Sequence, residues 1–204
     1  MSNRYKRPFD LGVIVLAHLA PPTLAVLLFV WLVIPLFIWI EDRGRIFFKQ
    51  ERVGLNGKMF SVWKFRTMVQ DANVLGHVWT QEGDERVTQV GRFLRRTGLD
   101  ELPQLLNVMR GDMSLVGPRP LAVEEQDLLE TQITHFRERL QVLPGLTGLA
   151  QLYNRADDSE EKLRYDIIYI RDMSWRLDVK LLFLTVVDVI LRRRDVRTGK
   201  SFSE

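Results

Sequence analysis

The residue types best suited to chemistry lie around two adjacent carboxylates, Asp100 and Glu101, which are followed closely by Pro103. A carboxylate can attack phosphorus as a nucleophile, and a neighbouring carboxylate can bind a divalent cation. Further along the chain, Arg119 stands in a proline-rich turn, and a guanidinium group matches a phosphate in two hydrogen bonds. Residues of these types are suited to handling a phosphate ester.

A helix whose first turn contains Pro103 would place the two carboxylates at its positive end, with Thr97 or Gly98 as its cap. Neighbours on a helix point about 100° apart, so one carboxylate can face phosphorus while the other holds a magnesium ion. Acidic residues are also common in a first helical turn for electrostatic reasons alone. A purely structural pair is therefore an open alternative.

Three basic side chains are candidates for binding phosphate. Arg119 lies between Pro118 and Pro120, which cannot continue a helix and so present the arginine on a fixed turn. Lys64 and Arg66 alternate in an extended segment and fall on one side of it. The alternatives are a solvated arginine on a surface turn and an ordinary polar strand face.

The segments that must position these residues predict an α+β fold that is mainly helical. Residues 46–50 and 58–65 are expected to be extended, and Asn56-Gly57 between them is a hairpin turn signal. Helices are expected at residues 90–96, 101–109, 121–140, 160–171 and 177–191. Residues 144–148 are expected to form a loop, and residues 71–85 a loop or an irregular helix.

Residues 11–40 form a nearly continuous apolar run, in which His18 is the only ionisable side chain. The run is too long for the core of a signal peptide and exceeds the roughly 20 residues that span a bilayer. However, Pro21-Pro22 lies inside it, and proline breaks a helix. A first arm of about 10 residues reaches roughly 15 Å, or about halfway into the hydrocarbon core.

Basic residues flank the apolar run on both sides, namely Arg4, Lys6 and Arg7 before it and Arg43, Arg45 and Lys49 after it. Because basic residues favour the cytoplasmic side, both ends are expected to stay inside. We therefore predict a re-entrant membrane helix hairpin. A kinked helix that spans the bilayer is the alternative, because membrane helices tolerate proline.

The last predicted helix, at residues 177–191, is too short and too often interrupted by charge to span a bilayer. Aromatic and basic residues flank it, namely Trp175, Arg176 and Arg192 to Arg194. This pattern is typical of an amphipathic helix in the headgroup layer. A core helix of the globular domain is an equal alternative.

Charge and composition exclude several classes of protein. The net charge is +3, so the chain is not a polycation built for nucleic acid. It has no cysteine, which excludes thiol catalysis, disulfides and thiolate metal sites. We expect a membrane segment with its flanks at residues 1–42, a cytosolic catalytic domain at 43–194 and a polar tail at 195–204.

Seven segments occur in a characteristic order: Lys6-Arg7-Pro8-Phe9-Asp10, Phe48 to Gly54, Phe60 to Met68, Asp100 to Asn107, Gly111 to Pro120, Pro144 to Gln151 and Leu177 to Lys180. Over nearly the whole chain, this ordered set resembles the bacterial sugar transferase family, specifically its small monotopic phosphoglycosyl transferases. The resemblance leads us to expect a small member, without the additional N-terminal membrane helices of larger ones.

The resemblance implies transfer of a sugar 1-phosphate from a UDP-sugar to a polyprenyl phosphate, with undecaprenyl phosphate as the expected acceptor. UMP would leave, and a covalent aspartyl-phosphosugar intermediate would form on the way. The reaction would be the first membrane step of a glycoconjugate or polysaccharide pathway. Its expected place is the cytoplasmic face of the bacterial inner membrane.

The resemblance also implies roles for individual residues. Asp100 matches the nucleophile, and Glu101 matches a residue that helps to bind Mg²⁺. Positions that look like the family's other active-site residues are occupied by Lys64, Pro118, Arg119, Pro120, Gln151 and Asp166. By composition alone, Asp166 serves equally well as an ion-pair partner.

Two positions depart from the family pattern. Ala20 stands where small members usually have serine before the helix-breaking proline, and Leu143 stands where many have arginine. A membrane-surface adaptor without catalysis and a nucleotide-sugar hydrolase are the competing interpretations. The sequence leaves open which sugar is carried and whether the protein forms a homo-oligomer.

Overall fold

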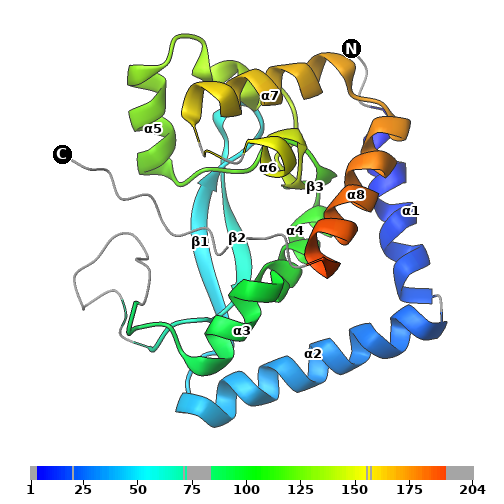
Figure 1. Cartoon of the computed structure of the whole chain (residues 1–204), viewed down its shortest axis with the longest axis vertical. Coiled ribbons are helices and arrows are strands. Elements are labelled where there is room, and N and C mark those ends of the chain that lie inside the picture. Colours follow the sequence, from blue (N-terminus) through cyan, green and yellow to red (C-terminus); the bar gives the residue numbers. More distant parts are fainter. Residues whose placement is uncertain are drawn as a thin grey trace.

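The computed structural model describes residues 4–19, 21–70, 72, 84–154, 156 and 158–191. Within these residues the protein is mainly helical, and a two-stranded antiparallel hairpin lies at its centre (Figure 1). The predicted α+β class with a short β-hairpin is therefore confirmed.

The apolar N-terminal run forms two helices, α1 (Lys6–Leu19) and α2 (Pro21–Asp42). The predicted break at the proline pair is confirmed, and Figure 1 shows the two helices running in different directions. Ala20, the residue that departs from the family pattern, lies outside the described residues. Pro35 lies within α2 without ending it.

Helix α2 has two different sides. Val30, Ile34 and Ile38 recur every fourth residue and pack in one cluster with Phe65 and Leu94. The other side is exposed and apolar, including Leu28, Phe29, Leu32, Leu36 and Ile40. Among the described residues, one segment, Thr23–Asp42, is long and apolar enough to cross a membrane.

The hairpin consists of β1 (Phe47–Val53) and β2 (Met59–Phe65), with Phe48 opposite Lys64 and Arg52 opposite Phe60. The connection is the short 3₁₀ turn η1 (Leu55–Gly57). Asn56 and Gly57 both have positive φ there, which is why an Asn-Gly pair suits the turn. The predicted hairpin is confirmed.

The segment that carries Asp100 and Glu101, called the carboxylate segment below, follows α3 (Gln89–Thr97). The start of α3 is hydrogen-bonded to the end of α2. The Glu41 carboxylate accepts hydrogen bonds from the backbone N–H groups of Gln89, at 2.6 Å, and Val90, at 3.2 Å. Thr88 caps the same helix by accepting from the N–H of Gly91. The first turn of α3 is thus held partly by the end of α2.

Residues 101–109 were predicted as one α-helix, and this prediction was wrong in its first half. The chain forms a 3₁₀ helix, η2 (Leu99–Gln104), followed by α4 (Leu105–Arg110). Pro103 has no backbone N–H to donate, which weakens the α-helical ladder at this point.

Two further predictions were wrong. Residues 144–148 are not a loop throughout, because β4 (Gly145–Thr147) pairs in parallel with β3 (Ser114–Val116). Residues 121–140 are not one helix, since α5 (Val123–Gln132) ends before η3 (Phe136–Gln141), and His135 between them has a φ of 63°. The short helix α6 (Leu149–Tyr153) follows β4.

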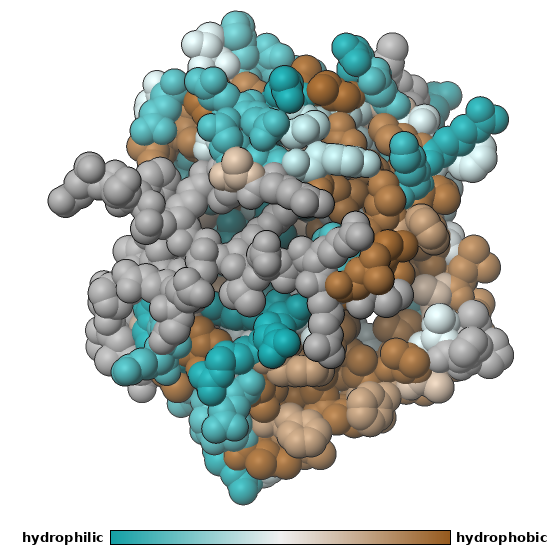
Figure 2. All heavy atoms as spheres, viewed as in Figure 1, coloured by the Kyte–Doolittle hydropathy of each residue, from teal (hydrophilic) through white to brown (hydrophobic). Residues whose placement is uncertain are grey.

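The C-terminal helices are α7 (Ser159–Asp172) and α8 (Trp175–Ile190), close to the predicted ranges. Asp178 and Leu181 are buried on one side of α8. Its other side exposes Trp175, Val179, Phe183 and Val186. Figure 2 shows apolar surface over the region of α1, α2 and α8. The flanking Arg192 to Arg194 lie outside the described residues.

Candidate active site

The carboxylate pair lies directly after a helix end. Gly98 has a φ of 70° and ends α3 in the left-handed conformation, which a glycine adopts without a steric penalty. Of the two predicted cap residues, Gly98 takes the N-cap position of η2, whereas the hydroxyl of Thr97 donates back to the carbonyls of Phe93 and Leu94. Asp100 and Glu101 then occupy the first turn of η2.

Glu101 is the centre of an ion-pair network. Its Oε1 lies 2.5 Å from Arg119 Nη2 and 3.3 Å from Lys64 Nζ, and its Oε2 lies 3.3 Å from Arg119 Nη1. Burial raises the pKa of Glu101, but the charges of Arg119 and Lys64 outweigh it and hold that pKa far below its usual range. Glu101 is therefore ionised at any physiological pH.

Asp100 is in a different state from its neighbour. Its side chain is half-buried, and among the described residues it receives no hydrogen bond. Burial raises the pKa of Asp100, and the Lys64 charge opposes that shift only in part. The carboxylate oxygens of Asp100 are therefore free to attack a substrate, whereas those of Glu101 are engaged.

Arg119 is fixed by a hydrogen bond to its backbone carbonyl as well as by the ion pair of its side chain. Its carbonyl accepts a hydrogen bond of 2.7 Å from Arg139 Nη2, and Arg139 Nε lies 2.8 Å from Asp166 Oδ2. The side chains of Arg139 and Asp166 are only 1% and 2% exposed. Asp166, from α7, thus contacts Arg139, which in turn fixes the turn that carries Arg119.

The turn itself continues the parallel pairing of β3 and β4. The N–H of Gly117 donates to the carbonyl of Thr147, and the N–H of Gly145 donates to the carbonyl of Pro118, each at 2.8 Å. A Cβ at Gly145 would lie 2.0 Å from the backbone nitrogen of Gly117, so only glycine permits this approach. Pro118 and Pro120 are buried on either side of Arg119.

Two of the predicted site residues lie in other contacts. Arg66 forms an ion pair with Asp42 at the end of α2, rather than with Glu101. Gln151, on α6, donates through Nε2 to the carbonyl of Leu146 at 3.3 Å. Neither residue joins the Glu101 network, and their roles stay predictions.

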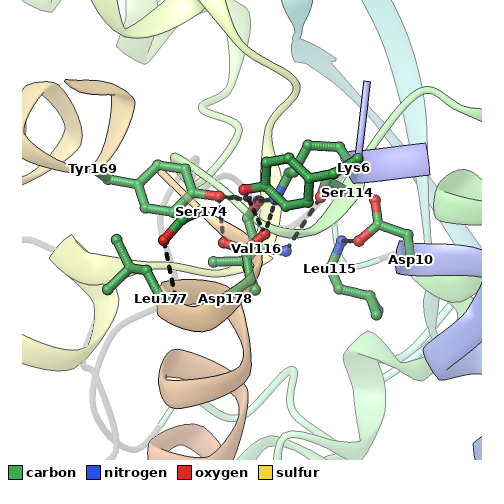
Figure 3. A network of polar contacts seen from close by, with 10 residues as sticks. Lys6, Asp10, Ser114, Leu115, Val116, Tyr169, Ser174, Leu177 and Asp178 are labelled. Carbon is green, nitrogen blue, oxygen red and sulfur yellow. Dashed lines mark hydrogen bonds and ion pairs between the residues drawn. The ribbon is translucent and has the colours of Figure 1, made fainter. Parts of the chain in front are cut away.

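A second buried network joins α1 to the same turn. Lys6 Nζ donates to the carbonyl of Val116 at 2.7 Å, to Tyr169 Oη at 2.8 Å and to Asp178 Oδ2 at 2.9 Å (Figure 3). Asp10 accepts from the N–H of Leu115 at 3.2 Å. The strand before Gly117 is therefore held by two side chains of α1.

Two residues near the site were not foreseen as functional. Arg139 falls in the helix predicted at residues 121–140, and nothing in its sequence neighbourhood marks it as buried. Arg52 lies half-buried beside the turn, with its Nη1 3.3 Å from the carbonyl of Pro120. The alternation of side chains in the hairpin could have pointed to Arg52, because it places Arg52 and the candidate Lys64 on one face.

The side chains around Asp100 and Glu101 determine how the site could bind magnesium. Among the described residues, no three His, Asp or Glu side chains gather in a group that could hold a metal ion by themselves. Magnesium in phosphate-handling sites often uses only one or two carboxylates together with the substrate's phosphates. The hard oxygens of Asp100 and Glu101 fit that substrate-dependent arrangement, although a metal at Glu101 would compete with Arg119 and Lys64.

Comparison with known proteins gives a consistent result. The family model described as "Bacterial sugar transferase" matches residues 1–192. The UDP-glucose:undecaprenyl-phosphate glucose-1-phosphate transferase of Klebsiella pneumoniae is 43% identical over 161 residues, which cover 76% of this chain and 35% of that protein. The undecaprenyl-phosphate glucose phosphotransferase of Komagataeibacter xylinus is 42% identical over 198 residues, covering 92% of this chain and 36% of that protein.

A third relative is named for a different sugar. The UDP-N-acetylgalactosamine-undecaprenyl-phosphate N-acetylgalactosaminephosphotransferase of Aeromonas hydrophila is 40% identical over 157 residues, covering 75% of this chain and 37% of that protein. The chain thus spans about a third of the length of these curated relatives.

Proposed function

The chain belongs to the bacterial sugar transferase family, and we propose that it transfers a sugar 1-phosphate from a UDP-sugar to undecaprenyl phosphate. The observation that carries the proposal is the contrast between the two carboxylates. Glu101 is neutralised by Arg119 and Lys64, while Asp100 beside it has free oxygens in a partly buried setting. The names of the relatives, which include UDP-sugar and undecaprenyl-phosphate transferases, support the substrate classes.

In the first step, an oxygen of Asp100 attacks the phosphorus that bears the sugar. The new oxygen–phosphorus bond forms an acyl phosphate. The bond from that phosphorus to the bridging oxygen of the diphosphate breaks, so that UMP leaves with the bonding electrons. The raised pKa of Asp100 favours this step, because a more basic carboxylate is a better nucleophile once it is ionised.

In the second step, a phosphate oxygen of the polyprenyl acceptor attacks the same phosphorus. The bond from phosphorus to Asp100 breaks, and the free carboxylate is restored together with a polyprenyl diphosphate sugar. Dividing the reaction lets the water-soluble nucleotide leave before the lipid phosphate arrives.

The cations beside Glu101 offset the negative charge that builds up on the phosphate. Arg119 has N–H donors beyond the two that face Glu101, and these can donate to phosphate oxygens, while Lys64 adds a point charge. The contact of the buried Arg139 side chain with the Arg119 carbonyl limits the movement of that turn. Such preorganised charge lowers the barrier without reorganisation during the reaction.

Magnesium belongs to the proposal as well. Glu101, with the donor's phosphates, would hold the ion, which would supply further neutralisation of the diphosphate charge. The expected result is that a chelator stops formation of the covalent intermediate and that added Mg²⁺ restores it.

We propose that α1 and α2 enter the bilayer from the cytoplasmic face of the inner membrane and return to it, with residues 1–42 as the membrane segment. The bend at Pro21 and the exposed apolar sides of both helices support this arrangement. The exposed stripe on α8 would rest in the headgroup layer.

The absence of native cysteine makes this topology directly testable. Pro8→Cys and Glu51→Cys place single thiols at exposed positions on either side of the apolar run and leave its flanking basic residues intact. In intact spheroplasts, an impermeant maleimide should label neither thiol, and both should react after permeabilisation. Labelling of one thiol from outside would show a spanning helix instead.

The covalent step is tested by intact-mass spectrometry. After incubation with Mg²⁺ and a panel of UDP-sugars, without lipid, the wild type should gain the mass of one sugar phosphate with its own donor. Asp100→Asn should gain none, while Asp127→Asn, an exposed aspartate on α5, should behave as the wild type. Turnover of the donor to lipid-linked product without any adduct would contradict the two-step route.

A further inference from the structure

Arg52 shares the face of the hairpin on which Lys64 contacts Glu101. The register pairs Arg52 with Phe60 and Lys64 with Phe48, so positions 48, 50 and 52 and positions 60, 62 and 64 point the same way. Arg52 and Lys64 are therefore about four residues apart along the strands, or roughly 13 Å.

The turn that carries Arg119 lies between these two cations. Lys64 reaches Glu101, the partner of Arg119, and Arg52 Nη1 donates to the carbonyl of Pro120, the next residue after Arg119. The N–H of Val53 donates to the carbonyl of Leu121 at 3.0 Å, which fixes the end of β1 against this turn. Three cations thus follow one another along the sheet face.

The charge of Arg52 is not matched at short range. Its hydrogen-bond acceptors are both neutral, namely the carbonyl of Pro120 and Gln50 Oε1, the latter at 2.6 Å. Among the described residues no carboxylate lies within ion-pair distance of it, although Glu125, Glu101 and Glu124 act on it from farther away. Burial and the neighbouring Arg119 lower the pKa of Arg52 to about 10.

A partly buried cation beside a second arginine is costly unless an anion compensates it. The planar fork of an arginine suits phosphate oxygens, which identifies the class of that anion. Two phosphates meet this chemistry, one on the nucleotide side of the sugar donor and one on the lipid acceptor.

The position of Arg52 favours the nucleotide. The Phe65 end of the hairpin packs against α2, whereas Arg52 lies near the opposite end, where β1 meets Leu121. In Figure 1 this end of β1 lies near α5, away from α2. A water-soluble donor can extend in that direction, whereas a lipid phosphate approaches from the membrane helices.

We propose that Arg52 binds the nucleotide-side phosphate of the sugar nucleotide and so positions the leaving group. The inference rests on the proposed transferase function. Lys64 and Arg119 then stabilise the phosphate that Asp100 attacks, and Arg52 binds the phosphate that departs with the nucleoside.

The experiment compares UMP and uridine as competitive inhibitors of adduct formation in the wild type, Arg52→Gln, Arg52→Lys and Arg137→Gln. Arg137 is an exposed arginine on η3 and serves as the matched control. Arg52→Gln should weaken UMP inhibition about tenfold or more, the usual effect of losing a charge-assisted hydrogen bond. Uridine inhibition should not change, and Arg52→Lys should recover part of the loss.

The same variants distinguish binding from a structural effect. A binding role predicts that the KM for the sugar nucleotide rises in Arg52→Gln while kcat and the KM for the acceptor stay near the wild-type values. Equal weakening of UMP and uridine, a higher acceptor KM with unchanged UMP inhibition, or no effect at all would each overturn the proposal. A wild type that forms neither adduct nor product would instead refute the transferase function.

Discussion

Replacing Asp166 by alanine should destabilise the protein far more than a matched change on the same helix. The substitution leaves the guanidinium of Arg139 buried with only neutral acceptors, the side-chain oxygen of Gln126 and the carbonyl of Arg119. Asp172 provides the matched change, because it also forms a short ion pair with an arginine, but at the exposed end of α7.

The magnitude follows from the burial of the pair. Breaking a buried ion pair by removing one partner typically costs about 3–5 kcal/mol. For a protein of this size each kcal/mol lowers Tm by roughly 2–4 °C, so Asp166→Ala should lower Tm by about 6–20 °C. Exposed ion pairs contribute little, and Asp172→Ala should leave Tm unchanged within error.

The assay is thermal unfolding of the detergent-solubilised protein, followed by fluorescence, together with adduct formation well below Tm. A double variant, Asp166→Leu with Arg139→Met, removes both charges and should recover most of the stability. Its rate of adduct formation should nevertheless stay below that of the wild type, because the Arg119 carbonyl has lost its hydrogen-bond donor. Equal Tm values for Asp166→Ala and Asp172→Ala, or full activity in the double variant, would refute this reasoning.

Three further predictions concern other parts of the site. Because burial raises the pKa of Asp100, the rate of adduct formation should fall on acidification at a higher pH than an exposed aspartate would give, which a kcat/KM profile against pH measures. Lys6→Met leaves Asp178 buried without its cation and should cost about 3 kcal/mol in thermal or chemical unfolding. Gly91→Ala brings a Cβ within 2.1 Å of the Thr67 carbonyl, so it should cost about 1–3 kcal/mol and slow adduct formation by displacing α3, checked by unfolding and mass spectrometry.

Locally determined features of the fold were predictable from the sequence. The break at Pro21 and the turn at Asn56-Gly57 depend on the backbone preferences of those residues themselves. The strands Ser114–Val116 and Gly145–Thr147 were missed because three residues carry no readable alternation. Their pairing depends on glycines that allow two distant segments to approach, which a single sequence does not reveal.

The candidate site was predictable in residue type but less so in arrangement. Lys64, Glu101 and Arg119 were named as candidates, and the structure brings them together. The placement of Arg66 against Asp42 depends on how the end of α2 meets β2, which strand alternation does not specify. Arg139 escaped notice because its burial results from the packing of η3 against α7, two segments that are separate in the chain.

The packing of α2 has a practical consequence for anyone who wishes to prepare a water-soluble version of this protein. Val30, Ile34 and Ile38 supply part of the interior that surrounds Phe65 and Leu94, and Glu41 completes the start of α3. Deleting residues 1–42 would remove the apolar side chains that pack against one side of the carboxylate segment. Solubility is better sought by replacing the exposed apolar residues of this helix with polar ones than by deleting the helix.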